Sequence, residues 1–348
     1  MILSQKIEIL EHLGKILNAI GNEEQWPGFE IGINETEYNE LAELVNRVHI
    51  YNGWFTASAV KESFKGIASW LNKTDLDKWV SGYTLNNDRP KTIAIIMAGN
   101  IPLVGFHDFI SVFLSGNKTL AKLSSDDKHL FPALIGVLEH FNPEINDWVT
   151  IKEQRIEGFD AVIATGSDNS ANYFHSYFGK YPHIIRKNRT SVAVIEGNET
   201  KEDLIALGRD VFTYFGLGCR NVSHVWVPKD FDLNRIFDAF FQFGDIINHN
   251  KYANNYDYNK AVYLMNMEDL LDNGFVLLKE DSNLNSPLGM LHFSRYSDKE
   301  EVVSFLKENE AKIQAVIGNA YIPFGKAQQP GLADYADGVD TMEFLTTL

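Results

Sequence analysis

The chain contains a single cysteine, Cys219, among its 348 residues. No disulfide can form within it, and such a composition is typical of proteins from a reducing compartment. Long apolar runs are lacking as well, because the first helical segment is interrupted by Gln5, Lys6 and Glu8. The sequence thus predicts neither a signal peptide nor a membrane span, and we expect a cytoplasmic protein.

Positive charge is scarce. The chain has 31 lysine and arginine residues against 47 aspartate and glutamate residues, a formal net charge of -16. The overall field would repel a polyanion or an anionic membrane surface, so the composition argues against a nucleic-acid partner. A local basic pocket for a small anionic ligand is compatible with this balance.

Several catalytic and metal-binding motifs are missing. The sequence holds no CxxC or HExxH, and its ten histidines show no metal-ligand spacing, so we expect no metal site. The GxSxG elbow of serine hydrolases is absent. GxGxxG and GxxxxGK[ST] are absent too, which excludes the two best-known phosphate-binding loops.

What is present is enough apolar sequence, 45% of the chain, for one large or two ordinary cores. Residues 1–90 place apolar side chains at helical spacing, as in Ile7, Leu10 and Leu13, and predict an all-helical region. Two of its helices are expected to begin at Thr56 and at Thr74, whose hydroxyl groups can cap a first turn.

From Lys91 onward, short runs rich in Val, Ile and Ala alternate with helical stretches. The runs are residues 92–99, 119–123, 160–166, 190–197 and 223–228. Strands that alternate with helices predict βαβ units and an open α/β sheet. Ligands bind such sheets at the carboxyl ends of the strands, so residues 99–102, 122–125, 166–167 and 215–221 are the candidates for chemistry.

Cys219 is the first candidate. Gly216 and Gly218 allow close approach of the backbone to a ligand, and Arg220 would favour the thiolate. The alternative is a small buried apolar side chain. His224 follows in the sequence as an apparent strand residue, which favours a structural histidine over an activating base.

Gly166 and Ser167 follow the predicted strand residues 160–165 and precede a helical stretch. The exposed N–H groups of such a helix start can bind an anion or a phosphate. An ordinary capped turn is the alternative, since the two residues match no known phosphate motif.

The order and spacing of these segments resemble the aldehyde dehydrogenase superfamily. Its Asn-x-Pro segment, whose amide stabilises the oxyanion, is similar to Asn100-Ile101-Pro102. Its GNxxxxK segment, whose lysine approaches the adenosine ribose, is similar to residues 116–122, which end at Lys122. Gly166 and Ser167 then correspond to the Gly-Ser turn near the cofactor.

Two further motifs carry the same resemblance. The nucleophilic cysteine of the superfamily stands four residues before a serine that opens a strand, as Cys219 stands before Ser223. Its C-terminal Pro-Phe-Gly is similar to residues 323–325. In NAD-preferring members an acidic residue follows the lysine by three positions, where this chain has the neutral Ser125. The resemblance therefore implies that NADPH is accepted at least as well as NADH, unless Asp126 or Asp127 turns inward.

One departure from the superfamily pattern is informative. Oxidising members carry a glutamate in an E-x-G-G segment, as base for the water that hydrolyses the thioester, whereas residues 185–189 here contain no acidic residue. Slow hydrolysis would leave transfer between the cysteine and an external thiol. Cations in this segment, Arg186 and Lys187, together with Arg220, could attract a phosphate-rich carrier such as coenzyme A; a solvated basic turn is the alternative.

This departure and residues 52–56 resemble the bacterial acyl-CoA reductases of the LuxC type. The resemblance implies reduction of a fatty acyl thioester, on coenzyme A or an acyl carrier protein, by NADPH or NADH through an acyl group on Cys219. A biosynthetic semialdehyde dehydrogenase and a non-catalytic acyl-binding subunit are the alternatives, and a homo-oligomer is left open.

The expected architecture is an α/β, aldehyde dehydrogenase-like fold. A helical region (1–90) would precede a Rossmann-type NAD(P)-binding domain (91–190 with 326–348), and a catalytic cysteine domain would span 191–325. The active site is expected in the crevice between the two domains.

Overall fold

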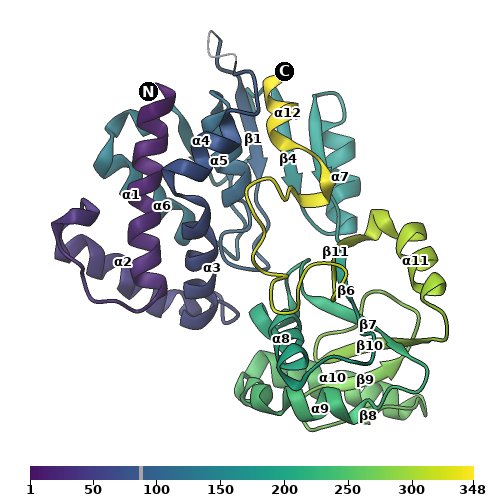
Figure 1. Ribbon diagram of the computed structural model, residues 1–348. Helices are drawn as coiled ribbons and strands as arrows, with labels where there is room; N and C mark the ends of the chain where they lie inside the picture. The colour runs from purple at the N-terminus through teal and green to yellow at the C-terminus, as the bar shows by residue number, and fades with distance from the viewer. Residues whose placement is uncertain (86–88) are drawn as a thin grey trace. The chain divides into compact units, whose positions relative to one another are not determined.

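The computed structural model describes residues 1–85 and 89–348, which divide into two compact units (Figure 1). Unit 1 comprises Met1–Lys187 and Gly331–Leu348, and unit 2 comprises Asn188–Pro330. The chain thus crosses between units at 187/188 and 330/331, against the expected boundaries 190/191 and 325/326. The helical region at 1–85 belongs to unit 1, because its apolar side chains share one core with the neighbouring sheet.

Unit 1 is built on a parallel sheet of order β3-β2-β1-β4-β5. Its strands are β1 (Thr92–Ile96), β2 (Lys118–Lys122), β3 (Val149–Lys152), β4 (Ala161–Thr165) and β5 (His183–Arg186). Its helices are α1 (Leu3–Gly21), α2 (Glu35–Arg47), α3 (Ala57–Trp70), α4 (Lys73–Val80), α5 (Phe106–Leu114), α6 (Leu130–Phe141), α7 (Asp168–Phe178) and α12 (Thr341–Thr346). Short 3₁₀ turns are η1 (Phe29–Ile31), η2 (Val48–Ile50), η3 (Pro143–Asp147) and η7 (Ala336–Gly338).

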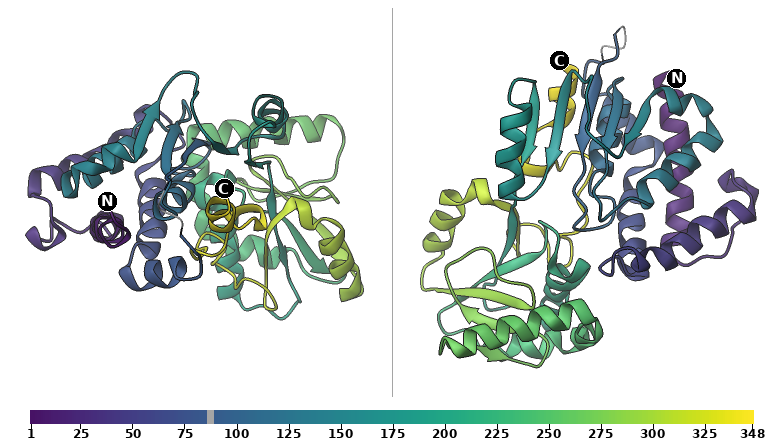
Figure 2. Two further views of the ribbon diagram at one scale, coloured as in Figure 1. Left: turned by 90° about the horizontal axis from the view of Figure 1, so that it is seen from above. Right: turned by 180° about the vertical axis from the view of Figure 1, so that it is seen from behind.

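Both faces of this sheet are buried, which explains its near-continuous apolar strands. Ile93 and Ile95 of β1 face the core that contains α5 and α6, whereas Ala94 and Ile96 face Phe174 of α7. Helix α1 contacts both α5 and α6, so the N-terminal helices extend the first of these layers (Figure 2).

The capping residues explain where the N-terminal helices begin. Thr56 caps α3, since its Oγ1 accepts from Ala59 N at 3.2 Å, as expected. Helix α4 begins before Thr74, at Lys73, because Asn72 is the cap and its Oδ1 accepts from Asp75 N at 2.9 Å. An asparagine is as good an N-cap as a threonine, which is why the expected start was wrong.

Unit 2 contains a second sheet, of order β11-β6-β7-β10-β9-β8, in which only the β8–β9 pair is antiparallel. The strands are β6 (Thr190–Val194), β7 (Val222–Pro228), β8 (Leu271–Asp272), β9 (Leu277–Glu280), β10 (Met290–Tyr296) and β11 (Ile313–Ile317). The helices are α8 (Lys201–Phe212), α9 (Asn234–Phe240), α10 (Asn250–Met265) and α11 (Lys299–Glu308), with 3₁₀ turns η4 (Thr213–Gly216), η5 (Phe241–Asn248) and η6 (Glu310–Lys312).

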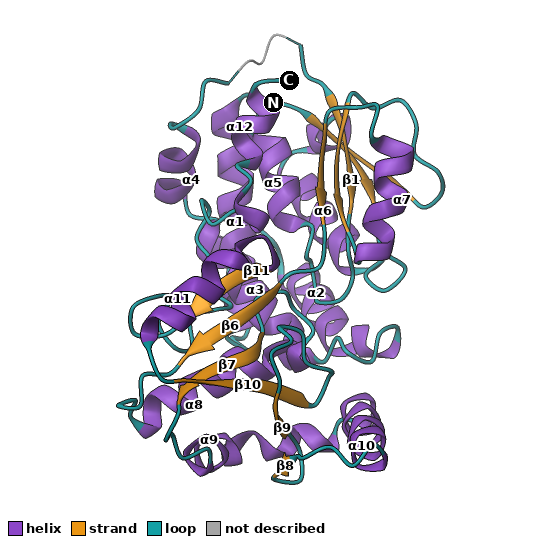
Figure 3. Cartoon of the chain, turned by 90° about the vertical axis from the view of Figure 1, so that its right-hand side faces the viewer, coloured by secondary structure: helices purple, strands orange, loops and turns teal. Residues whose placement is uncertain are grey.

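Helices cover both faces of the second sheet as well. Apolar side chains of α8 and α9 pack on one face and Val302 and Phe305 of α11 on the other (Figure 3). The sequence thus predicts β1, β2, β4, β6 and β7 to within three residues at each end.

Arg186 is the last residue of β5 and lies in the interior of unit 1. Its Nη1 is 2.6 Å from Asp108 Oδ2, and its Nη2 donates to Thr341 Oγ1 at 2.9 Å. The residue is 4% exposed. The expectation that Arg186 is available to a substrate phosphate is therefore wrong. Residues 183–186 form a strand, and the guanidinium of Arg186 joins β5 to α5 and α12.

Replacement of Arg186 should destabilise unit 1. In Arg186→Met the Asp108 carboxylate loses its buried partner, which costs about 3–5 kcal/mol of unfolding free energy. Urea unfolding measures this. The exposed neighbour supplies the control, since Lys187→Met should change stability by less than about 0.5 kcal/mol. An Arg186→Met protein as stable as this control would contradict the structural role.

Candidate active site

Cys219 lies in unit 2 on the connection between α8 and β7, and its side chain is exposed. The preceding backbone is left-handed over three residues, with φ of 53° at Tyr214, 59° at Phe215 and 81° at Gly216. Two of the three are not glycine, and each such residue costs about 1–3 kcal/mol. Other contacts must therefore hold this connection in place.

Asn221 supplies these contacts. Its Nδ2 donates to three carbonyl oxygens, of Asp210 at 3.0 Å, Val211 at 3.2 Å and Thr213 at 2.7 Å. Its Oδ1 accepts from Gly218 N at 2.8 Å. The side chain is 2% exposed, so it satisfies the last carbonyls of α8 from inside the fold.

Asp210 connects this network to a second loop. Its carboxylate accepts from Gly325 N at 2.6 Å and from Ala327 N at 3.0 Å. Burial raises the pKa of Asp210 to about 6, against the lowering effect of the two amide groups. The Pro-Phe-Gly segment at 323–325 is thus brought beside the cysteine loop, although the two are far apart in sequence.

The strand after Cys219 is anchored by hydroxyl groups. Ser191 Oγ donates to the carbonyl oxygen of Cys219 at 3.0 Å. Ser223, the serine of the expected spacing, is hydrogen-bonded to Thr190 and donates to Leu284 O at 2.5 Å. These contacts fix the backbone on both sides of the thiol.

His224 is a structural histidine, as expected. It is 0% exposed, and its Nδ1 lies 3.0 Å from Asn283 O. Burial lowers the pKa of His224 to about 4, so the ring is neutral at physiological pH. It belongs to the interior of β7 and is not placed as a base for Cys219.

Asn100 lies in unit 1, on the loop that follows β1, and is exposed. The loop is held by Asp127, whose Oδ2 accepts from the amide of Leu103 at 2.7 Å. Leu103 has a φ of 60°, so this bond stabilises a left-handed residue. Ser63 of α3 donates to Pro102 O at 3.0 Å, which ties the helical region to the same loop.

Lys122 ends β2, next to β1 in the sheet, and Ser125 is exposed in the loop that follows. Asp126 is exposed, and its carbonyl oxygen accepts from Asn52 Nδ2 at 3.2 Å. The carboxylate of Asp127 is buried against Leu103, and burial raises its pKa to about 6.

Gly166 and Ser167 connect β4 to α7. Ser167 Oγ accepts from Ser170 N at 3.2 Å and caps the helix. A Cβ at Gly166 would lie 2.8 Å from Ser170 Cβ and 2.9 Å from a ring carbon of Phe174, so only glycine fits this turn.

The predicted cofactor and oxyanion residues thus lie at the carboxyl edge of one parallel sheet. Asn100 follows β1, Lys122 ends β2 and Ser125 follows it, and Gly166 and Ser167 follow β4. The strand order reverses between β1 and β4, which is where such sheets bind nucleotides. The glycine turn and the capped start of α7 suit a phosphate, and Lys122 adds a cation. These residues fit a nicotinamide dinucleotide.

The remaining predicted residues are Lys187, which is exposed at the end of unit 1, and Arg220. Arg220 is half-buried in unit 2, and its Nη1 lies 3.4 Å from Ala327 O. The sequence alone does not predict the roles of Asp210 and Asp127. Neither stands in a motif, and only the fold reveals the distant amides that they accept from.

Within residues 1–85 and 89–348, no three His, Cys, Asp or Glu side chains come together as metal ligands. Over the same ranges, none of the helices has the length and apolar character that a membrane crossing requires.

The chain is similar in fold to solved aldehyde dehydrogenases. A propionaldehyde dehydrogenase from Clostridium phytofermentans has a TM-score of 0.60 at 10% identity, over 94% of this chain and 82% of that chain. An NADP-dependent glyceraldehyde-3-phosphate dehydrogenase from Bacillus halodurans, in complex with NADP, has a TM-score of 0.58 at 14% identity, over 91% and 74%. The chain therefore has the aldehyde dehydrogenase-like fold that its motifs predicted.

Within this fold class, the sequence identifies the family. The family model described as acyl-CoA reductase (LuxC) matches residues 39–236, and the chain belongs to this family. The long-chain acyl-protein thioester reductase of Aliivibrio fischeri is 22% identical over 274 residues, which are 69% of this chain. This chain spans 57% of the length of that relative.

Loss of the Asn221 side chain should loosen the cysteine loop. Asn221→Ala leaves three carbonyls without their side-chain donor, and at about 1 kcal/mol or more for each we expect a loss of roughly 3 kcal/mol in unfolding free energy. Urea unfolding of the full chain measures this. Asn234→Ala, at an exposed position of the same unit, is the control. A loss no greater than that of the control would show that Asn221 does not hold the loop.

Proposed function

We propose that the chain reduces a fatty acyl thioester to the aldehyde through an acyl group on Cys219. The observation that carries this proposal is the exposed thiol on a left-handed connection, which Asn221 and Asp210 hold from inside the fold. A buried structural cysteine would need no such support. The family and the name of the Aliivibrio fischeri relative favour an acyl thioester as substrate.

In the first step the Cys219 thiolate attacks the acyl carbonyl carbon. A C–S bond forms, the bond to the carrier sulfur breaks, and the carrier thiolate leaves. The side-chain amide of Asn100 and the backbone N–H of Cys219 stabilise the oxyanion formed on the way. Arg220 is the next residue in the sequence, and its positive charge favours the thiolate form of Cys219.

In the second step the acyl group on Cys219 is released as the aldehyde. A nicotinamide cofactor, when bound, would supply the hydride for this step. The carbonyl carbon is reduced, the C–S bond breaks, and the Cys219 thiolate is regenerated. Asn100 again donates to the oxyanion, and Gly166, Ser167 and Lys122 are the residues that would hold the cofactor.

Cofactor choice depends on the loop after β2. We infer that Ser125 faces the adenosine ribose, where an acidic residue would repel a 2'-phosphate. Asp127 is directed at Leu103 N, which supports acceptance of NADPH at least as readily as NADH. We further propose a cytoplasmic location, because a single cysteine is typical of proteins from a reducing compartment.

Covalent acylation tests the mechanism directly. After incubation with a long-chain acyl-CoA and no nicotinamide, intact-mass spectrometry should show one added acyl group, located on Cys219 by peptide mapping. Cys219→Ser should abolish the adduct, and the assignment is unambiguous because the chain has one cysteine. The acyl-enzyme would be refuted if wild-type protein stays unmodified without nicotinamide, although the same preparation turns over substrate when nicotinamide is added.

The role of Asn100 has a separate test. Asn100→Ala removes one oxyanion donor, which should lower kcat about 100-fold, since such a donor contributes about 2.7–4 kcal/mol. KM for the acyl thioester should change little. Asn142→Ala is the control, because Asn142 caps η3 and belongs to none of the loops that follow β1, β2 or β4. A near-normal kcat in Asn100→Ala would show that another group stabilises the oxyanion.

A further inference from the structure

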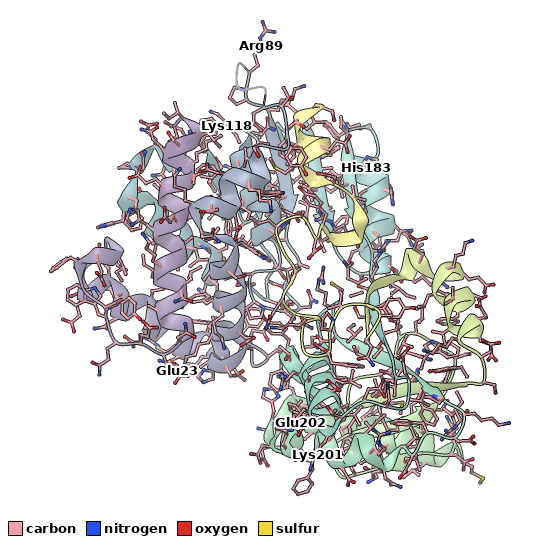
Figure 4. The ribbon with its side chains drawn as sticks, in the orientation of Figure 1. Glu23, Arg89, Lys118, His183, Lys201 and Glu202 are labelled. Atoms are coloured by element: carbon pink, nitrogen blue, oxygen red, sulfur yellow. The ribbon has the colours of Figure 1, made fainter. Side chains whose placement is uncertain are left out.

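Two exposed cations belong to the surroundings of the Pro-Phe-Gly segment, one within its loop and one packed against it. Arg209 is in the last turn of α8, and Lys326 directly follows Gly325. Figure 4 marks Lys201 and Glu202 in the first turn of α8, so Arg209 is at the opposite end of that helix, where the cysteine connection begins. Arg220, which follows Cys219, reaches the same loop through Ala327 O at 3.4 Å.

The loop is shaped to hold the guanidinium of Arg209. Gly325 has a φ of 79°, and a Cβ at this position would lie 3.0 Å from Arg209 Nη2 and 3.4 Å from its Nε. Asp210 accepts from the amides of Gly325 and Ala327 on the inner side of the loop. The Lys326 side chain is therefore presented outward, and its Nζ donates to Gln329 Oε1 at 2.9 Å.

The charges of these two residues are not matched by ion pairs. Within the described ranges, 1–85 and 89–348, neither Arg209 nor Lys326 forms a salt bridge with a carboxylate. The carboxylate of Asp210 is turned to backbone amides and is 1% exposed. In a chain of net charge -16, an anionic substrate needs local cations of this kind to approach the thiol.

We propose that Arg209 and Lys326, with Arg220, bind the phosphate of a phosphorylated thiol carrier whose acyl group is delivered to Cys219. The guanidinium of Arg209 offers a planar fork of donors that suits phosphate oxygens, and Lys326 adds a mobile point charge. The inference rests on the proposed function for the identity of the ligand. Both coenzyme A and the phosphopantetheine arm of an acyl carrier protein present this chemistry.

Calorimetric binding of coenzyme A to full-length Cys219→Ser protein tests the site without turnover. Arg209→Gln and Lys326→Gln, added singly, should each raise Kd about tenfold, a loss of about 1.4 kcal/mol. The control Lys201→Gln removes the same charge from the other end of α8 and should leave Kd unchanged. Pantetheine, which lacks phosphate, should bind all four proteins equally.

Phosphopantetheine distinguishes the two carriers. A loss of its binding equal to that of coenzyme A assigns the site to the phosphate that both carriers share, and an unchanged affinity assigns it to the nucleotide phosphates of coenzyme A. Equal coenzyme A affinity in Arg209→Gln, Lys326→Gln and Lys201→Gln overturns the proposal. The proposed function can fail separately. If coenzyme A binding depends on Arg209 but acyl-CoA never acylates Cys219 of the wild-type protein, the proposed function is refuted and the binding site stands.

Discussion

The hydrogen bonds of Asn221 are the constraint on which the candidate site depends. A thiol that must meet a substrate cannot be buried, and the connection that carries it passes through three left-handed residues, two of them unfavourable. One buried amide offsets this cost, because it satisfies the last carbonyls of α8 and the amide of Gly218 at once. The position of Cys219 is therefore determined by a buried side chain whose hydrogen bonds all go to the backbone.

Buried carboxylates serve the same purpose in both units. Asp210 accepts from the amides of Gly325 and Ala327 in unit 2, and Asp127 accepts from the amide of the left-handed Leu103 in unit 1. Burial raises the pKa of each to about 6, a value often associated with a catalytic acid or base. The geometry indicates a different role, since each carboxylate is directed at backbone amides. The raised pKa is here a cost of holding a loop from inside.

The extent to which the sequence predicts this structure follows from the range of each interaction. Strands β1, β2 and β4 are predictable because burial on both faces makes them apolar without interruption. Strand β5 is not among the predicted strands, since it is short and ends in Arg186, whose partner Asp108 lies 78 positions away in the chain. Cys219, Asn100 and the Gly166 turn stand in local motifs. The pairing of Asp210 with Gly325, across 115 positions, has no local signal.

The placement of Arg186 also bears on the fate of an acyl group on Cys219. Oxidising members of the superfamily carry a glutamate near this point of the chain, and this glutamate activates the water that hydrolyses the thioester. In this chain the corresponding residues include a strand end whose charged group is buried in an ion pair, and the exposed residue that follows is Lys187. Arginine and lysine side chains present hydrogen-bond donors and lack the carboxylate that takes a proton from water in the oxidising members. On the proposed function, the acyl group therefore persists on the thiol until it is reduced. The lack of a base at these positions thus favours aldehyde release over hydrolysis.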